Sequence, residues 1–140
     1  MEEYVVGKTR DTGFQIGVRK SYPLSLEQAW SLITSPEGIG LWLGESKDFY
    51  LAKGRRYQTM DGTSGEVRVV NPQENIRLTW QPKSWGQAST LQIRVIPSGK
   101  DKTVIAFHQE KLSGPEEREQ MRQHWAAVLD KLIQVATRLD

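Results

Sequence analysis

The sequence predicts an α+β fold, in which one antiparallel sheet with a single apolar face is covered by a long C-terminal helix. Apolar residues recur with a period of two over residues 55–111, and in steps of three and four over residues 113–139. Short turn sequences such as Asp61-Gly62 separate the successive strands, so neighbouring strands pair antiparallel. The apolar face of the sheet needs a cover, and the terminal helix is the one predicted element long enough to provide it.

Length and composition indicate one ordinary globular domain, expected over residues 1–140. With 140 residues, 37% hydrophobic and 26% charged, the chain can bury roughly two-thirds of its unfolded surface. It contains no cysteine, which excludes disulfides, zinc–thiolate sites and thiol nucleophiles. No signal-peptide pattern or membrane-length apolar run occurs, so we expect a cytoplasmic location and no membrane partner. The net charge of +2 is too small to indicate a nucleic-acid partner.

The N-terminal part of the chain is predicted to contribute one strand. Residues 1–13 are polar and contain glycines, and we expect a loosely held extension there. From Phe14 to Tyr22 the side chains alternate, with Phe14, Ile16 and Val18 on one side, as in a half-buried strand. Pro23 then ends the strand, because proline cannot donate a hydrogen bond to a ladder.

Two short helices are predicted to follow this strand. Ser25 and Gln28 have the spacing of a capping box, and the residues after Ser25 form a short amphipathic pattern. The sequence Ser35-Pro36-Glu37 repeats this start signal and predicts a second helix over residues 37–43, which Gly38 and Gly40 weaken. Neither helix is long enough to form a core of its own.

Five further strands are predicted, which makes a six-stranded sheet. The alternation is sharpest in the middle, where Leu78 and Trp80 are interleaved with Arg77 and Thr79. We expect the inner wall of the sheet to begin with Ile76, Leu78, Leu91 and Ile93. The five strands are Arg55–Met60, Gly65–Val70, Asn75–Gln81, Thr90–Ile96 and Thr103–Lys111.

The C-terminal helix is predicted over Ser113–Leu139. Ser113 and Glu116 are expected to form a capping box, and Pro115 suits the first turn, where its missing N–H needs no partner. One face of this helix is apolar and is therefore expected to lie on the sheet. That face is formed by Met121, Trp125, Val128, Leu129, Leu132, Val135, Ala136 and Leu139.

Several short sequences, in this order and at this spacing, resemble one superfamily. They are Ser25-Leu-Glu-Gln-Ala-Trp30, Gly38-Ile-Gly-Leu-Trp-Leu43, Leu78-Thr-Trp80, Thr103-Val-Ile-Ala-Phe-His108 and the final helix with its tryptophan. Over residues 14–136 the chain resembles the START-like (SRPBCC) superfamily, and within it the branch named for the C-terminal domain of the Aha-type activator of the heat-shock-ninety chaperone ATPase. The resemblance implies a helix-grip fold, a curved antiparallel sheet wrapped around the long helix, often with an apolar cavity between them.

This resemblance and the large aromatic side chains predict a ligand cavity between the sheet and the C-terminal helix. A curved sheet and a straight helix leave a gap that side chains, the short helices or a ligand fill. Trp80 and Trp125 are alternatively plain core residues, whereas Trp42 and Trp85 are candidates for a rim or gate. The predicted ligand-binding residues are Trp42, Tyr57, Trp80, Trp85, Leu91, Ile93, His108, Met121, Trp125, Val128 and Leu132.

His108 is the candidate for acid–base chemistry in this cavity. If the even-numbered residues of strand 103–111 point inward, His108 and Glu110 lie together and could orient a polar group or exchange protons. Alternatively, Ile105 and Phe107 form the inward row, because both are apolar as well. The ordinary interpretation is that His108 bonds to a neighbouring group and that Glu110 reaches solvent.

Other chemistries find little support in the sequence. No metal-ligand spacing, phosphate-binding glycine loop or nucleophile elbow occurs, so no metal or cofactor is predicted. His124, the other histidine, is expected at the surface. The outward-facing Arg19, Arg68, Arg77 and Arg94 form either a solvated face or a docking surface for an acidic partner.

Three classes of function stay open. The leading one is a module that holds a small apolar or amphipathic molecule in the cavity. The second is a protein-interaction module with a chaperone or another protein as partner, as the resemblance implies. The third is a cyclase- or hydrolase-like enzyme that uses His108, which the sequence favours less than binding. A monomer and a homodimer are both open, because an edge strand or the N-terminal extension could pair.

Overall fold

The computed structural model describes residues 8–9, 13–46 and 48–137, which form a seven-stranded sheet and three helices. The strand order is β1-β2-β7-β6-β5-β4-β3, and every neighbouring pair is antiparallel. The six predicted strands and the α+β helix-grip fold are confirmed, and the two-residue β1 is added at one edge. The strands are β1 (Lys8–Thr9), β2 (Gly13–Tyr22), β3 (Arg56–Gln58), β4 (Ser64–Asn71), β5 (Asn75–Trp80), β6 (Ser89–Gly99) and β7 (Lys102–Leu112).

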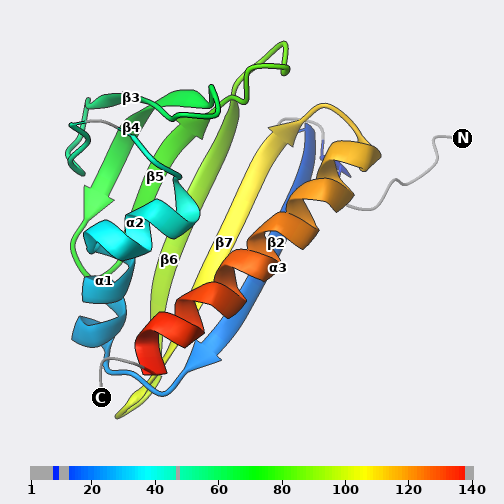
Figure 1. Ribbon diagram of the computed structural model, residues 1–140. Coiled ribbons are helices and arrows are strands. Elements are labelled where there is room, and N and C mark those ends of the chain that lie inside the picture. Colours follow the sequence, from blue (N-terminus) through cyan, green and yellow to red (C-terminus); the bar gives the residue numbers. More distant parts are fainter. Residues whose placement is uncertain (1–7, 10–12, 47, 138–140) are drawn as a thin grey trace, which may run out of the picture.

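The three helices all lie on one face of the curved sheet (Figure 1). They are α1 (Leu26–Thr34), α2 (Pro36–Trp42) and α3 (Pro115–Thr137). The long α3 packs along β2 and β7, whereas α1 lies over β6 and β7, and α2 contacts both α1 and α3. Residues 1–7 and 10–12 of the expected N-terminal extension, and residues 138–140 at the end of the expected helix, lie outside the described residues.

The predicted helix caps are present, with one correction. Ser25 and Gln28 form the expected capping box, and the Ser35 hydroxyl accepts a hydrogen bond from the N–H of Gly38 at 3.0 Å. At the start of α3, however, Glu117 rather than Glu116 accepts the hydrogen bond from the N–H of Ser113, at 3.1 Å. The helix begins at Pro115, so Gly114 occupies the N-cap position and Ser113 the position before it, and the predicted Ser113–Glu116 capping box does not form.

The inner wall of the sheet is the one predicted from the sequence. Ile76 pairs with Ile93 and Leu78 with Leu91 across β5 and β6, and all four side chains have 0% exposure. Burying each of these side chains contributes roughly 1.5–3 kcal/mol to folding. The predicted apolar residues of α3 that the structure describes, from Met121 to Ala136, are buried in the same core as these four side chains.

The open question about β7 is decided in favour of the odd-numbered row. Ile105 and Phe107 are 0% and 1% exposed and face the helices, whereas His108 and Glu110 lie on the outer face. The prediction that His108 lines a cavity under α3 is therefore wrong. Strand register explains the outcome, because Phe107 is paired with Ile93, which belongs to the inner wall.

Candidate functional site

The residues predicted to bind a ligand lie mostly in the core. His108 is on the outer face, where its Nε2 lies 3.0 Å from Oε1 of Gln15. Trp85 is partly buried and packs against the core from the loop between β5 and β6. The remaining nine predicted ligand-binding residues are buried: Trp42, Tyr57, Trp80, Leu91, Ile93, Met121, Trp125, Val128 and Leu132. A ligand-binding role for Trp85 and for these nine residues stays a prediction.

Aromatic side chains fill the space between the sheet and α3. Trp125 is 0% exposed and stacks on Phe107, with ring centroids 4.9 Å apart and an angle of 9° between the planes. Trp80 meets the Trp125 ring edge-on at 5.2 Å. Offset stacking and edge-to-face contact are the favoured geometries for aromatic pairs. Trp80 and Trp125 are therefore core residues, as one of the two interpretations of the sequence expected.

A buried chain of hydrogen bonds holds these rings in place. The Trp125 indole N–H donates to Oε1 of Gln109 at 2.8 Å, and the Gln109 amide donates to the Ser89 hydroxyl at 2.8 Å. Ser89 in turn donates to the carbonyl oxygen of Trp80 at 2.6 Å. The Trp80 indole N–H is buried, and no described residue accepts a hydrogen bond from it. Gln109 was not foreseen as a core residue, because a buried glutamine has no signal in an apolar pattern.

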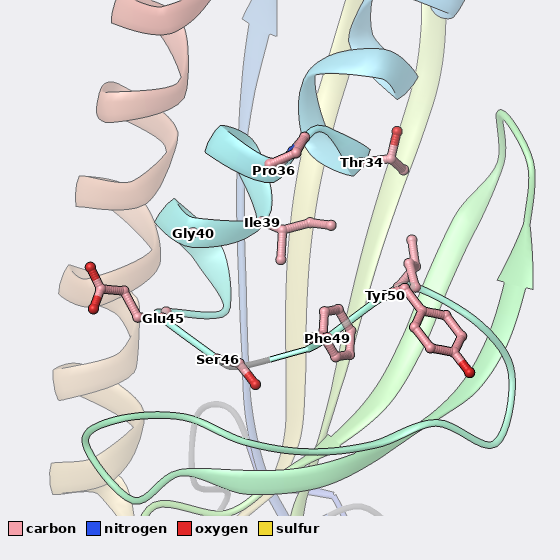
Figure 2. Close-up of a pocket in the computed structure, with 10 residues that line it drawn as sticks. Thr34, Pro36, Ile39, Gly40, Glu45, Ser46, Phe49 and Tyr50 are labelled. Carbon is pink, nitrogen blue, oxygen red and sulfur yellow. The ribbon is translucent and has the colours of Figure 1, made fainter.

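An open pocket lies beside α2, away from α3 (Figure 2). We call it the α2 pocket; its volume is about 450 Å³. One wall is formed by the end of α1 and by α2, and the other by the loop before β3. The lining residues are Thr34, Pro36, Ile39, Gly40, Gly44, Glu45, Ser46, Phe49, Tyr50 and Leu51.

The interior of the α2 pocket is mainly apolar. Figure 2 shows Ile39 of α2 directed toward Phe49 of the loop, whereas the Glu45 carboxylate is directed away from that pair. Ile39, Phe49 and Leu51 are partly buried and pack against the core. Gly40 adds room, because a Cβ atom built there would meet no atom within 4 Å. The pocket is thus a partly open apolar space next to a helix.

Close packing fixes the position of α2. A Cβ atom at Gly38 would lie 1.9 Å from the carbonyl oxygen of Leu32, so only glycine permits this approach of α2 to α1. Trp42, at the other end of the helix, is 1% exposed, and its indole N–H donates to the carbonyl oxygen of Ile33 at 2.8 Å. Trp42 therefore anchors α2 and is not at a rim.

The loop wall of the α2 pocket is held by polar contacts. The N–H of Met60 donates to the carbonyl oxygen of Glu45 at 2.8 Å, and the Ser46 hydroxyl donates to that of Gln58 at 3.2 Å. The Arg55 guanidinium donates to the carbonyl oxygen of Asp48 at 2.6 Å and lies 4.5 Å from the centre of the Tyr50 ring. The sequence offered no signal for this wall, because residues 44–51 have neither a helical nor a strand period.

Two of the described titratable groups near the core, Tyr57 and His124, do not contact a carboxylate that could form an acid–base pair with them. Burial raises the pKa of Tyr57, whose hydroxyl donates to the carbonyl oxygen of Thr79 at 2.5 Å. His124 is exposed, as predicted, yet its ring lies edge-on to Trp125 at 4.6 Å. Partial burial of the ring, and then the positive charge of Lys131, lower the pKa of His124. Within the described residues, no three His, Asp or Glu side chains gather closely enough to share a metal ion.

Many solved structures have a similar fold, and three of them illustrate the similarity. CalU16 from Micromonospora echinospora is 22% identical, with a TM-score of 0.75 over 87% of this chain and 73% of that one. MLL2253 from Mesorhizobium loti is 24% identical, with a TM-score of 0.74 over 90% of this chain and 98% of that one. The Aha1 dimer from Colwellia psychrerythraea is 16% identical, with a TM-score of 0.68 over 84% and 92%. Identities this low establish the fold alone.

None of the described helices is both long and apolar enough to span a membrane.

Sequence comparison identifies the family. No curated protein sequence matches the chain. The model of one family, described as "Activator of Hsp90 ATPase homolog 1-like protein", matches residues 23–137, which run from the end of β2 to the end of α3. The chain belongs to the Activator of Hsp90 ATPase homolog 1-like family.

Proposed function

We propose that this protein binds a small apolar or amphipathic molecule in the α2 pocket. The observation that carries the proposal is the opening between Ile39 and Phe49, two apolar side chains that face each other and are only partly covered. A volume of about 450 Å³ falls in the range typical of small-molecule sites, roughly 300–1,000 Å³. The apolar part of the ligand packs between these side chains, and a polar group remains at the open mouth.

The space beneath Trp125 supports a ligand less well. A molecule placed there has to displace the Trp125 ring from Phe107 and break its hydrogen bond to Gln109. The broken bond leaves a buried acceptor without a partner, which costs about 1–3 kcal/mol. Binding in the α2 pocket carries no such cost, because the pocket is already open.

A blocking substitution tests the proposal. Gly40→Leu places an apolar side chain into the α2 pocket, where a Cβ atom meets nothing within 4 Å. Decanoic acid, 1-octanol and naphthalene are added to ¹⁵N-labelled protein, and amide shifts are followed by NMR. We expect saturable shifts at Ile39, Gly40 and Phe49 in the wild type, and their loss in the Gly40→Leu variant.

The matched control adds the same side chain at another open glycine. A Cβ atom at Gly86, in the exposed loop between β5 and β6, also meets nothing within 4 Å. Gly86→Leu is expected to bind the probes as the wild type does. Equal binding by the Gly40→Leu variant, or no shift at these residues with any of the three probes, would contradict the proposal.

Family membership favours a second candidate, a protein-interaction module. The family model carries the description of an Hsp90 ATPase activator homologue, and one similar structure is described as an Aha1 dimer. In this case the chain binds a chaperone ATPase and raises its rate of hydrolysis. Measuring that rate with and without the protein tests the candidate, and Gly40→Leu is expected to leave any stimulation unchanged. An unchanged rate at saturating protein contradicts it.

A further inference from the structure

A second hollow lies on the outer face of the sheet, opposite to the three helices. Its volume is about 370 Å³, and it lies over β2, β7 and β6. Gly17, which has no side chain, and Ala106, which has only a methyl group, line the hollow, and Arg19 and Arg94 line it on either side. Because the sheet lies between this hollow and the α2 pocket, the two sites are separate.

The register of the sheet places the two arginines on either side of one alanine. Arg19 of β2 pairs with Ala106 of β7, and Ala106 pairs with Arg94 of β6. Adjacent strands are about 4.8 Å apart, so the Cα atoms of the two arginines are separated by about 10 Å. The methyl group of Ala106 does not fill the space between them. Both guanidinium groups can therefore reach one anion placed above Ala106.

The four exposed arginines predicted on this face differ in their partners. Arg68 lies 3.3 Å from the Glu66 carboxylate, and Arg77 donates to Glu110 at 3.1 Å. Among the described residues, no carboxylate lies within 4 Å of Arg19 or Arg94. Of these four arginines, the two without a described carboxylate partner are thus the two that line the hollow.

The residues next to the arginines give the hollow one polar end and one apolar end. Next to Ala106 along β7, the pairing Gly17–His108–Gln92 forms the following row across the three strands. The Gln92 side-chain oxygen accepts a hydrogen bond from Asn75 at 3.3 Å, which leaves its amide nitrogen as a donor. On the opposite side of the arginine row, partly buried Ile96 supplies an apolar contact.

We infer that this hollow binds a small organic anion, a carboxylate or a phosphate monoester attached to an apolar body. Arg19 and Arg94 hold the anionic group above Ala106 through charge-assisted hydrogen bonds, for which planar guanidinium groups are well suited. The apolar body extends from Ala106 to Ile96, at the apolar end of the hollow. This site is independent of the α2 pocket, so each proposal can fail without the other.

Paired charge-neutralising variants test the inference. Benzoate and phenyl phosphate are the probes, and dissociation constants are measured by NMR titration of amides at Gly17, Arg94 and Ala106. The double variant Arg19→Gln/Arg94→Gln is expected to bind both probes at least about tenfold more weakly, because charged hydrogen bonds are lost. The control Arg68→Gln/Arg77→Gln removes the same charge from the same face, and we expect a change below about threefold, from loss of long-range attraction only.

Two comparisons separate this site from general attraction of anions. Benzyl alcohol, which has the ring without the charge, is expected not to shift these amides, and inorganic phosphate is expected to bind more weakly than phenyl phosphate. Equal weakening in the two double variants, or equal binding of phosphate with and without the phenyl group, overturns the inference. Absence of saturable shifts with both probes also overturns it. Gly40→Leu is expected to leave the titration unchanged, and melting curves verify that each variant is folded.

Discussion

The indole ring of Trp125 lies nearly parallel to the ring of Phe107, with centroids 4.9 Å apart and planes 9° apart, and this contact joins α3 to β7. The Trp125 indole N–H donates to the side-chain oxygen of Gln109, which lies two residues after Phe107 on β7. Helix and sheet are therefore held together by a stacked pair and a buried hydrogen bond at one place. This arrangement occupies the space where a ligand cavity was predicted.

The two core tryptophans are expected to differ in their response to truncation. Trp125→Phe leaves the Gln109 oxygen without its donor and opens a small cavity, so it should lower the free energy of unfolding by about 2–4 kcal/mol. Trp80→Phe removes an indole N–H that has no acceptor among the residues that the structure describes, so its cost should be about 1–2 kcal/mol. Urea unfolding of both variants measures the difference. A Trp80→Phe variant as unstable as Trp125→Phe would show that the Trp80 N–H is bonded in solution.

Two glycines of α2 are expected to respond to alanine with opposite sign. At Gly38 the new Cβ atom would lie 1.9 Å from the carbonyl oxygen of Leu32, so α2 must shift and the protein should lose at least about 2 kcal/mol. At Gly40 the Cβ atom meets nothing, so Gly40→Ala should gain about 0.5–1 kcal/mol from helix propensity. Thermal unfolding compares the pair. Destabilisation by Gly40→Ala would mean that α2 packs differently from the arrangement described.

Gln73 is expected to be replaceable by glycine with a gain in stability. It has a φ of +61°, in the turn where the Glu74 N–H donates to the carbonyl oxygen of Asn71 at 3.0 Å. The left-handed conformation costs a residue with a Cβ atom about 1–2 kcal/mol, and glycine avoids this cost but loses more entropy on folding. A net gain of about 0.5 kcal/mol is the expected result of denaturant titration. The neighbouring exposed Glu74→Gly serves as the control and should lose stability.

His124 is expected to make stability depend on pH. Its pKa is lowered in the folded protein from the usual 6.5, because part of the ring is buried and Lys131 is near, although Asp61 opposes the change. The unfolded chain therefore binds the proton more readily than the folded chain does. The contribution of His124 to the free energy of unfolding is fully present above about pH 6.5, the pKa in the unfolded chain. It is lost as the pH falls through the lower pKa of the folded protein. Melting temperatures between pH 5 and 8 should decrease less toward acid in His124→Gln than in the wild type, and parallel curves would contradict this.

Periodicity alone predicted the elements that bury a continuous apolar row. Ile76, Leu78, Leu91 and Ile93 were expected as the inner wall, and all four have 0% exposure. Each strand presents one apolar face at a spacing of two, and the long helix presents one at a spacing of three and four, so the faces can be identified without coordinates. The same information was ambiguous for β7, where both rows contain apolar residues. The pairing of Phe107 with Ile93 decided which row of β7 faces the helices.

The candidate sites could not be predicted in this way. The α2 pocket depends on a loop without periodicity and on the close approach of Gly38 to Leu32, and the outer hollow depends on the strand register that brings Arg19 and Arg94 to the same alanine. The sequence by itself determined the strands, the helices and the apolar faces, because these follow from spacing within one segment. Only the tertiary structure decided which space is filled and which is open, because that depends on side-chain volumes brought together from segments far apart in the chain.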